Sequence, residues 1–402
     1  MRDLRAITGP VGRLTLLMSC VFAGMGVSLP FMARWLEGVH HLSGVQIAVV
    51  VSSAQLARLF IGPLIASWAD GFDDRRTPLR WLALLAVALY AVLFHVQGFW
   101  ALVVVSLLAQ TAGQAITPLV EGAILRGALS GGMSFGFARG IGSVAFIISN
   151  VVGGAIIARF GLGAVAIWVM TSMTAAAVSA VVALKPDAIV HDEAPSGFRQ
   201  RLKQALVLFR KPSFAIPVAA ASLIQCAHAF YYGFSTLVWA KQGFSDGLIG
   251  WLWAFGTLIE VGLLWTLPRF EKRFNPETLI ALGGAAAVIR WTAMAFLPPP
   301  LVLWPLQALH ALTFAATHVG ALKLVQREAP ARVAGVAQTL YAALASGTLA
   351  GLAMLLAGAL YDAGGAHGYL AMAALGALGV VAMLFVPPVR LFGAKRDIGA
   401  VQ

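Results

Sequence analysis

A glutamate and an arginine lie inside two consecutive apolar segments of the chain. Glu121 falls in the last third of residues 99–125, and Arg139 falls in the first third of residues 133–158. If both segments are helices joined by residues 126–132, the two charges lie at a similar depth, about 8–10 Å from one membrane face at ~1.5 Å per residue. A charge near the bilayer centre costs roughly 2.5–3.5 kcal/mol, so such residues usually pair or face a cavity. The pair therefore either locks two helices together or belongs to a polar site at the centre of a transporter.

Other ionisable residues lie at about the same depth in other apolar segments. The whole set comprises Arg58, Glu121, Arg139, His228, Glu260, Arg290 and His310. Secondary transporters place substrate and coupling-ion sites near mid-depth, between two repeats that move around them. Three arginines against two glutamates favour an anionic substrate group, whereas a neutral histidine can simply hydrogen-bond a neighbouring helix. A carboxyl group in an apolar setting can hold a proton near neutral pH, so we expect Glu260 or Glu121 to carry the coupling proton.

The elements that must position these residues are membrane-spanning helices. The chain of 402 residues is 60% hydrophobic and only 11% charged, with a mean hydropathy of +0.85, whereas soluble proteins are about 25% charged. Its apolar residues come in long runs, and about 20 apolar residues cross the ~30 Å hydrocarbon core as a helix. Backbone groups must be hydrogen-bonded within lipid, so such runs favour helices over a barrel. We expect an all-α polytopic membrane protein with twelve transmembrane helices in two six-helix halves.

A polar stretch separates the two halves. We expect an N-terminal half over residues 1–184, a cytoplasmic linker over residues 185–213 and a C-terminal half over residues 214–402. The expected helices are 12–35, 42–69, 79–97, 99–125, 133–158 and 161–184, then 214–241, 245–267, 277–296, 301–325, 333–361 and 367–386. Within the linker, residues 198–209 have amphipathic spacing with Arg and Lys on the polar side, which suits a helix lying on an anionic lipid surface.

The net charge of +12 sets orientation. The expected helices place 22 of the 28 Lys and Arg on one side, three near the other side and three inside the membrane. This asymmetry follows the positive-inside rule, so we expect no nucleic-acid partner, and both termini in the cytoplasm of a bacterial inner-membrane protein. Cys20 and Cys226 lie within expected helices of different halves and suggest neither a disulfide framework nor a metal cluster. No catalytic motif indicates an enzyme.

The loop after the second expected helix resembles the signature of the major facilitator superfamily. It reads Ala66-Ser67-Trp68-Ala69-Asp70-Gly71, followed by Arg75-Arg76, with Ala66 where the usual signature begins with glycine. By this resemblance, Asp70, Arg75 and Arg76 help to hold the inward gate.

The segment around Glu121 and Arg139 resembles lactose permease. The chain reads Pro-x-Val-Glu and then Phe-Gly-x-Ala-Arg-x-x-Gly, with a spacing of 18 residues between Glu121 and Arg139. The resemblance implies that these two residues bind substrate hydroxyls and that Ser143 lines the site. Arg290 and His310 match the arginine and histidine of that family's proton site. Gln307 and Thr313 replace its lysine and its proton-carrying glutamate, which argues against galactoside transport by the same proton route.

A likeness over nearly the whole chain points to the phenylpropionic acid permease family of proton symporters. It rests on Leu29-Pro30-Phe31, Trp35-Leu36, Ala57-Arg58-Leu59, Arg139-x-x-Gly-Ser-Val-Ala-Phe, Glu260, Ile289-Arg290-Trp291 and Leu309-His310. The most specific match is the run His228-Ala229-Phe230-Tyr231-Tyr232-Gly233-Phe234-Ser235. The resemblance implies proton-coupled symport and weakly indicates the substrate.

We therefore expect a secondary transporter for proton-coupled symport of a small organic carboxylate, an aromatic acid among the options. The expected substrate-binding residues are Arg58, Glu121, Arg139, Ser143, His228, Tyr232 and Arg290, and the expected proton-coupling residues are Glu260, Glu121 and His310. The expected partners are the small-molecule substrate, protons and membrane lipid, with no cofactor beyond the proton gradient, and the protein is expected to be a monomer. A sugar or nucleoside symporter stays an alternative. Drug efflux by antiport is a weaker one, because residues 149–154 lack the proline usual in the fifth helix of family antiporters.

Overall fold

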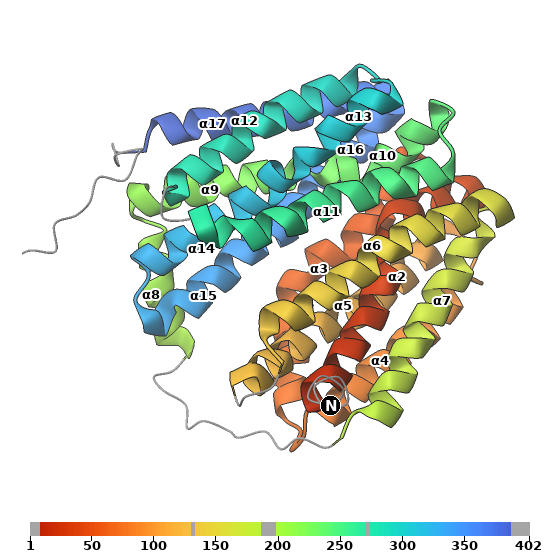
Figure 1. The fold of residues 1–402 in the computed structure, drawn as a ribbon, viewed down its shortest axis with the longest axis horizontal. Coiled ribbons are helices and arrows are strands. Elements are labelled where there is room, and N and C mark those ends of the chain that lie inside the picture. Colours follow the sequence, from red (N-terminus) through yellow and green to blue (C-terminus); the bar gives the residue numbers. More distant parts are fainter. Residues whose placement is uncertain (1–8, 130–132, 186–197, 271–273, 387–402) are drawn as a thin grey trace, which may run out of the picture.

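The computed structural model describes residues 9–129, 133–185, 198–270 and 274–386. The described residues form two bundles of helices, joined through the linker helix α8 (Phe198–Leu208). In Figure 1 the first bundle, coloured red to yellow-green, lies beside the second, coloured green to blue. The expected all-α architecture is therefore confirmed.

Six long elements build the N-terminal bundle. They are α2 (Pro10–His40), α3 (Gly44–Asp70), α4 (Arg76–Leu93), α5 (Phe99–Leu129), α6 (Phe135–Phe160) and α7 (Gly163–Val178), the last continued by the π-helical turn η1 (Ser179–Ala183). Serine side chains cap the N-termini of two of these helices. Ser43 caps α3 and forms a reciprocal pair with Gln46, and Ser134 accepts a hydrogen bond from the backbone of Phe137 at the start of α6. Such side chains satisfy the backbone N–H groups that a helix leaves free at its N-terminus.

The C-terminal bundle contains more interruptions. Its elements are α9 (Pro212–Cys226), α10 (Ala229–Lys241), α11 (Asp246–Phe270), α12 (Pro276–Ala295), α13 (Pro300–Ala308), η3 (Ala311–Ala316), α14 (Thr317–Glu328), α15 (Ala331–Ala342), η4 (Ala343–Leu349), α16 (Ala350–Gly364), η5 (Gly365–Gly368) and α17 (Tyr369–Leu384). Two of the expected spans are thus broken near their middle. Their breaks fall at His228, between α9 and α10, and at Leu309 and His310, between α13 and η3.

The described helices are long and apolar enough to cross a membrane many times. Ten pass a test of length and composition, or eleven when the bent pair Gly44–Ala57 and Phe60–Asp70 counts as one span. One of the ten, Val333–Leu384, has 52 residues, about 78 Å of helix at 1.5 Å per residue and more than twice the hydrocarbon thickness. Gly365 interrupts it with a φ of +54°, so this stretch holds two of the twelve expected spans.

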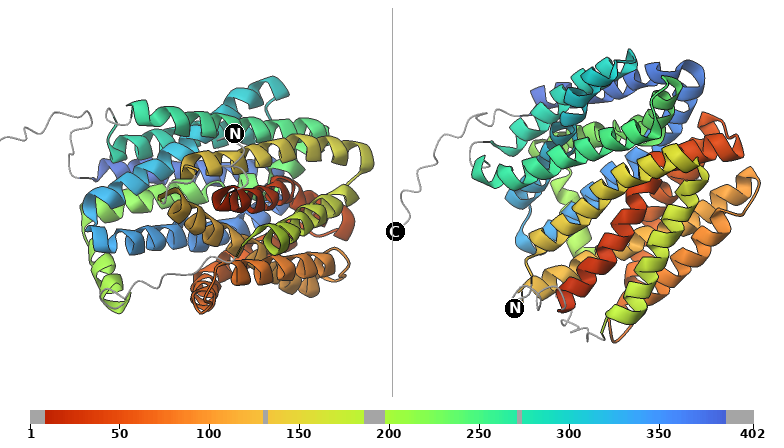
Figure 2. Two further views of the ribbon diagram at one scale, coloured as in Figure 1. Left: turned by 60° about the horizontal axis from the view of Figure 1, so that its bottom comes forward. Right: turned by 45° about the vertical axis from the view of Figure 1, so that its right-hand side comes forward.

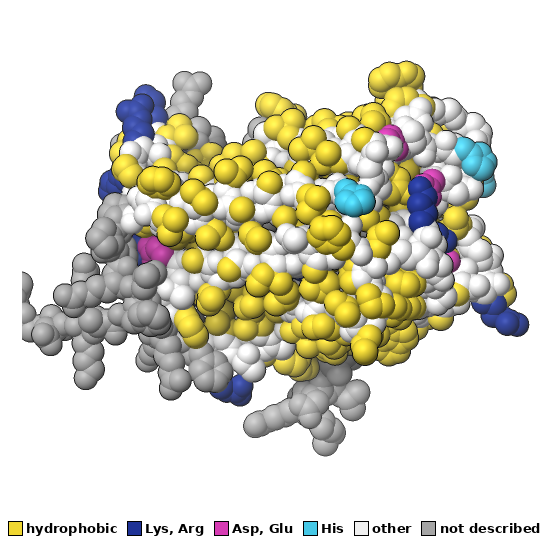
Figure 3. All heavy atoms as spheres, turned by 90° about the horizontal axis from the view of Figure 1, so that it is seen from above, with side chains coloured by type: hydrophobic (Ala, Val, Ile, Leu, Met, Phe, Trp, Pro, Cys, Tyr) yellow, Lys and Arg dark blue, Asp and Glu magenta, His cyan; other side chains and the backbone are white. Residues whose placement is uncertain are grey.

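The exterior of the molecule matches a lipid environment. In Figure 3, hydrophobic side chains cover most of the visible face, and the charged side chains lie toward its two ends. Large apolar side chains are exposed on several helices, including Trp265 on α11 and Phe160 on α6. A soluble monomer rarely exposes so large an apolar surface, so these faces belong against lipid.

Helices of the two bundles pack directly against each other. The contacts join α6 to α11, α3 to α16 and α2 to α10, and Figure 2 shows α6 (yellow) alongside α11 (green) in both views. Gly154 and Gly250 permit the close approach of α6 and α11. A Cβ at Gly154 would lie 2.6 Å from the backbone oxygen of Asp246, and one at Gly250 would overlap the backbone oxygen of Asn150. Small residues let membrane helices cross at short range in this way.

Polar contacts join the bundles at the end opposite α8, which we call the far end. Arg34 on α2 pairs with Asp246 on α11 at 3.1 Å, and Glu37 pairs with Lys241 on α10 at 3.2 Å. The hydroxyl of Tyr361 also donates to Glu37 over 3.1 Å. Residues from α2, α10, α11 and α16 thus close the far end between the bundles.

The linker helix packs against protein on its apolar side. The sequence predicts a helix over residues 198–209, and α8 confirms it over Phe198–Leu208. Ala205 and Leu208 are buried, and α8 contacts α15. Leu206 and Val207 are about half exposed, at 48% and 53%. One apolar face of α8 therefore packs against α15. Contact between the remaining surface of α8 and an anionic lipid surface stays a prediction.

Candidate functional site

A cavity lies between the two bundles, and we call it the central cavity. It encloses about 690 Å³ including its open mouth. The described residues that line it are Phe22, Met25 and Leu29 of α2, Arg139, Ser143 and Phe146 of α6, Tyr231 and Tyr232 of α10, Trp253, Thr257 and Glu260 of α11, with His310 and Phe314. Both halves contribute charged residues, as expected for a site around which two halves move.

Glu121 and Arg139 form an ion pair beside this cavity. The Nε atom of Arg139 lies 2.9 Å from Oε1 of Glu121, with the two side chains 39% and 30% exposed. Arg139 also donates to Ser143 Oγ over 3.0 Å and lies over the ring of Phe22 at 4.5 Å. Their matched depth predicted this pairing, and the structure places the two side chains together. Their role in binding substrate stays a prediction.

A row of close polar contacts begins at Glu260, which the C-terminal half contributes to the cavity wall. Nε2 of His310 lies 3.3 Å from Oε2 of Glu260, and Nη1 of Arg290 lies 3.1 Å from Nδ1 of His310. A guanidinium only donates, so Nδ1 must accept and the ring proton of neutral His310 sits on Nε2, facing Glu260. A second proton on Nδ1 would point at a cation. The structure thus places His310 between Glu260 and Arg290, and the proton-coupling roles of Glu260 and His310 stay predictions.

Arg290 lies behind His310 and does not line the central cavity. Its side chain is fully buried. It donates to Gln307 Oε1 over 2.8 Å and to Thr313 Oγ1 over 3.2 Å, and it stacks on the rings of Tyr231 and Trp291. In this conformation its Nη1 and Nη2 groups donate to side chains of the same half, while its Nε group is buried without a hydrogen-bond partner. A contact between Arg290 and substrate stays a prediction.

His228 also lies one layer behind the cavity wall. Its Nδ1 lies 3.1 Å from the backbone oxygen of Gln225, and its Nε2 lies 3.0 Å from Thr313 Oγ1. Because a carbonyl only accepts, Nδ1 carries the proton and Nε2 accepts from the hydroxyl of Thr313. The Gln225 carbonyl lies at the break after α9, where the regular helical bonding is interrupted. His228 therefore stabilises the break between α9 and α10, and it makes no direct contact with the central cavity.

Aromatic side chains form the wall opposite Arg139. Tyr231 stacks on Trp253 with ring centroids 4.5 Å apart, and Tyr232 lies 6.0 Å from the same indole. Tyr232, which the sequence singled out, lines the cavity, as does Phe314. Flat apolar faces of this kind suit an aromatic or aliphatic body on a charged ligand.

The remaining expected residues lie elsewhere or outside the described set. Arg58 belongs to α3, but its side chain is outside the described residues. Asp70 ends α3 and is exposed. Arg75 precedes α4, and Arg76 donates to the backbone oxygen of Val181 in the same half over 2.8 Å. The described contact of Arg76 thus ties α4 to η1, and a role of this loop in the inward gate stays a prediction.

Sequence reasoning missed a group of uncharged amides in the N-terminal half. Gln55 on α3 and Gln110 and Gln114 on α5 line a second cavity with Tyr90 of α4. A signal was available, because Gln110 and Gln114 are spaced four residues apart within an apolar run and share one helix face. They were missed because the search for site residues considered ionisable side chains, and glutamine is uncharged.

The chain is similar to known transport proteins over most of its length. A probable 3-phenylpropionic acid transporter of Escherichia coli (strain K12) is 26% identical over 360 residues, covering 89% of this chain and 92% of the relative. The maltose permease of Geobacillus stearothermophilus is 26% identical over 354 residues, covering 85% of each. The crystal structure of the nucleoside transporter NupG superposes with a TM-score of 0.78 at 17% identity, covering 94% of this chain and 99% of that one. The latter likeness shows the fold alone.

These relatives and the fold neighbour are transporters. The family model described as MFS_1 like family matches residues 13–371, nearly all of the described chain. The expected membership of the major facilitator superfamily and the expectation of a permease rather than an enzyme are both confirmed. The chain belongs to the MFS_1 like family and is a multi-pass membrane transporter.

Proposed function

We propose that the protein is a proton-coupled symporter of a small organic carboxylate. The observation that carries this proposal is the presence of Arg139 and Glu260, from opposite halves, on the wall of one aromatic-lined cavity. The relative from E. coli, described as a probable 3-phenylpropionic acid transporter, supports an aromatic acid as one option. The excess of Lys and Arg expected on one face supports an inner-membrane location with both termini cytoplasmic.

Arg139 is the group proposed to hold the substrate carboxylate. Its guanidinium faces the cavity and is only partly used by Glu121 and Ser143. A guanidinium can bind a carboxylate through two parallel hydrogen bonds, which a lysine cannot reproduce. The aromatic wall formed by Tyr231, Tyr232 and Trp253 would then contact the apolar body of the acid.

Charge balance gives a reason for proton coupling. Among the described side chains, the cavity and its immediate neighbours hold two guanidinium groups, on Arg139 and Arg290, and two carboxyl groups, on Glu121 and Glu260. Their formal charges cancel when both carboxyl groups are ionised. A bound carboxylate adds one negative charge, and a proton on Glu260 restores neutrality. Uncompensated charge is costly within a membrane, so we propose that one proton accompanies each monovalent acid.

Binding of an acid and its amide tests the recognition step. The ligands are 3-phenylpropionate and 3-phenylpropionamide, measured by calorimetry on purified wild type and Arg139→Lys. A charge-assisted hydrogen bond is worth roughly 1.5–3 kcal/mol, so the substitution should weaken the acid about tenfold to hundredfold and leave the amide nearly unchanged. Arg159→Lys, at the other end of α6, is the matched control. Equal loss of both ligands in Arg139→Lys contradicts the carboxylate assignment.

A neutral, hydroxyl-bearing substrate is the second candidate. The intact Glu121–Arg139 pair offers an acceptor and a donor side by side at the cavity, which suits a sugar or nucleoside hydroxyl. In that case Glu121→Gln is the most severe change, and an acid has no advantage over its amide in wild type. The same four measurements, with Glu121→Gln added, separate the two functions.

A further inference from the structure

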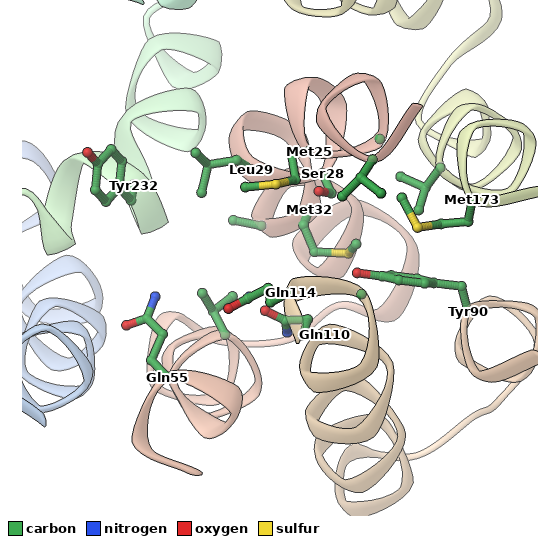
Figure 4. Close-up of a pocket in the computed structure, with 16 residues that line it drawn as sticks. Met25, Ser28, Leu29, Met32, Gln55, Tyr90, Gln110, Gln114, Met173 and Tyr232 are labelled. Atoms are coloured by element: carbon green, nitrogen blue, oxygen red, sulfur yellow. The ribbon is translucent and has the colours of Figure 1, made fainter. Parts of the chain in front are cut away.

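A second cavity, which we call the side chamber, lies within the N-terminal half. It encloses about 860 Å³ including open space and is lined by residues of α2, α3, α4, α5 and α7, together with Tyr232 of α10 in the other half. Figure 4 shows Gln55, Gln110 and Gln114 along one side of it, with Tyr90 at the end opposite Tyr232. Met25, Leu29 and Tyr232 line both this chamber and the central cavity. The two spaces are therefore neighbours, and these three side chains lie at their common boundary.

The side chamber contains polar groups that no protein atom satisfies. Oε1 of Gln55 is buried without a hydrogen-bond partner. Within the described part of the chain, nothing hydrogen-bonds the Gln114 amide, the Tyr90 hydroxyl or the Ser28 hydroxyl. A buried polar group such as Gln55 Oε1 almost always has a partner, and the other three groups belong to residues that border the chamber. These four groups therefore face either water or a polar part of a ligand.

The side chains that line the chamber indicate which chemical group of a ligand could bind there. All the residues that line the chamber are uncharged, so no described side chain there compensates an ionised group. Amide and phenol groups supply both donors and acceptors, which matches a hydroxyl group better than a purely accepting carbonyl. Met25, Met32 and Met173 supply the adjoining apolar surface, and methionine adapts its shape to ligands and contacts aromatic rings favourably.

Local packing keeps this polar face open. Gln110 and Gln114 lie on one face of α5, and Nε2 of Gln110 is held by Ser106 Oγ at 2.7 Å. Gly113 lies between them in sequence, and a Cβ there would lie 3.6 Å from the ring of Tyr90. That distance is an ordinary van der Waals contact, and Figure 4 shows the Tyr90 hydroxyl pointing toward the amides of Gln110 and Gln114.

We propose that the side chamber binds an uncharged hydroxyl group at the distal end of the substrate, while the carboxylate lies at Arg139. The inference rests on the proposed function and narrows its substrate class to hydroxylated acids with an apolar body. Gln55, Gln114 and Tyr90 are the specificity-determining residues, because their groups gain partners only when the hydroxyl is present.

Two isosteric acids test the proposal. The probes are 3-(4-hydroxyphenyl)propionate and 3-(4-methylphenyl)propionate, together with the amide of each, and affinities are measured by calorimetry on the purified full-length protein. The wild type should prefer the hydroxy compound. Gln114→Leu and Tyr90→Phe should each weaken it about three- to tenfold, the value of one hydrogen bond, without weakening the methyl compound. Tyr90→Phe removes a single oxygen atom, so this variant should fold and its affinities can be measured.

The outcomes are distinguishable from those of the carboxylate test. Gln242→Leu, which removes an amide at the end of α10 outside both cavities, is the matched control and should leave the hydroxy-to-methyl ratio unchanged. Equal affinity of the hydroxy and methyl compounds in wild type, or an unchanged ratio in both chamber variants, overturns the proposal and indicates a water-filled chamber. Amides that bind as well as acids, with the hydroxyl preference retained, contradict the carboxylate function alone. Binding of none of the four compounds contradicts both.

Discussion

Nε2 of His310 lies 3.3 Å from Oε2 of Glu260, and Arg290 donates a hydrogen bond to its other ring nitrogen, Nδ1. The imidazole is therefore fixed between a carboxyl group that faces the central cavity and a fully buried guanidinium. This arrangement fixes which ring nitrogen carries the proton. It leaves Glu260 as the member of the chain that can exchange protons with the cavity.

The first prediction concerns proton coupling through Glu260. Glu260→Gln keeps an acceptor for His310 but removes the ionisable group. We expect loss of proton-driven accumulation with downhill flux or exchange retained, measured in proteoliposomes with and without an imposed pH gradient. Glu328→Gln, a carboxyl change at the end of α14, should accumulate substrate normally. Unchanged accumulation in Glu260→Gln would exclude Glu260 as the proton carrier.

The second prediction concerns Arg290, whose contacts are structural in this conformation. Lysine offers one point charge where the guanidinium makes three hydrogen bonds and stacks on two rings. Arg290→Lys should therefore lower the free energy of unfolding by roughly 3 kcal/mol, since hydrogen bonds to charged groups are worth about 1.5–3 kcal/mol each. The measurement is thermal or denaturant unfolding of the purified protein.

Binding by the same variant separates structure from recognition. The folded fraction of Arg290→Lys should retain its affinity for the acid within about threefold, whereas Arg139→Lys should lose it about tenfold or more. A selective loss of acid over amide affinity in Arg290→Lys would show that Arg290 reaches the substrate in another conformation.

The depth of each charged residue could be predicted from the sequence, but its direction around the helix axis could not. Rise per residue placed Glu121 and Arg139 at one level, and the ion pair follows from that. Arg290 lies in an equally apolar span, and only the packing of α12 against its neighbours turns it behind His310. The same packing decides that His228 supports a helix break instead of lining the cavity.

For the fold as well, composition predicted the helices that span the membrane, whereas the breaks within helices and the contacts between them depend on packing. Apolar runs and turn residues predicted the spans, because hydrocarbon requires long helices with satisfied backbones. The breaks at His228 and His310 carry no proline or glycine at the broken positions. Side chains bond to backbone oxygens near these breaks: Gln225 donates to the oxygen of Phe314, and His228 donates to that of Gln225. Contacts between residues hundreds of positions apart, such as Glu37 with Tyr361, leave no local pattern in the sequence.

A third prediction concerns orientation. With 22 of 28 basic residues expected on one face, α8 and both termini should lie in the cytoplasm. Fusions of alkaline phosphatase and green fluorescent protein after Lys211 and after the far-end residue Gly243 provide the measurement. Fluorescence is expected for the first site and phosphatase activity for the second. The reverse pattern would overturn the assigned orientation.

The final prediction concerns closure of the far end by Asp362. Its carboxylate oxygens accept hydrogen bonds from the backbone N–H groups of Gly44 and Val45, over 2.7 and 2.9 Å. These two groups begin α3, so a side chain of the C-terminal half caps a helix of the N-terminal half. A negative charge at a helix N-terminus is also favoured by the helix dipole. The contact exists only while the two halves are together at this end.

Removing the charge should therefore shift the protein toward states opened at the far end. Asparagine keeps one acceptor oxygen, so Asp362→Asn loses one of the two hydrogen bonds and the negative charge. Together these are worth about 1 kcal/mol, which should raise the ratio of opened to closed molecules roughly fivefold. The separation of the halves is measured by pulsed electron paramagnetic resonance between spin labels at positions 41 and 367. The labels are attached to cysteines that replace His41 and His367 in a background lacking Cys20 and Cys226. Asp74→Asn removes a cap within one half, where Asp74 accepts from Thr77, and should leave the distance distribution unchanged. If Asp362→Asn leaves it unchanged as well, the cap does not hold the far end closed, because a contact made only in the closed state must bias that state when it is lost.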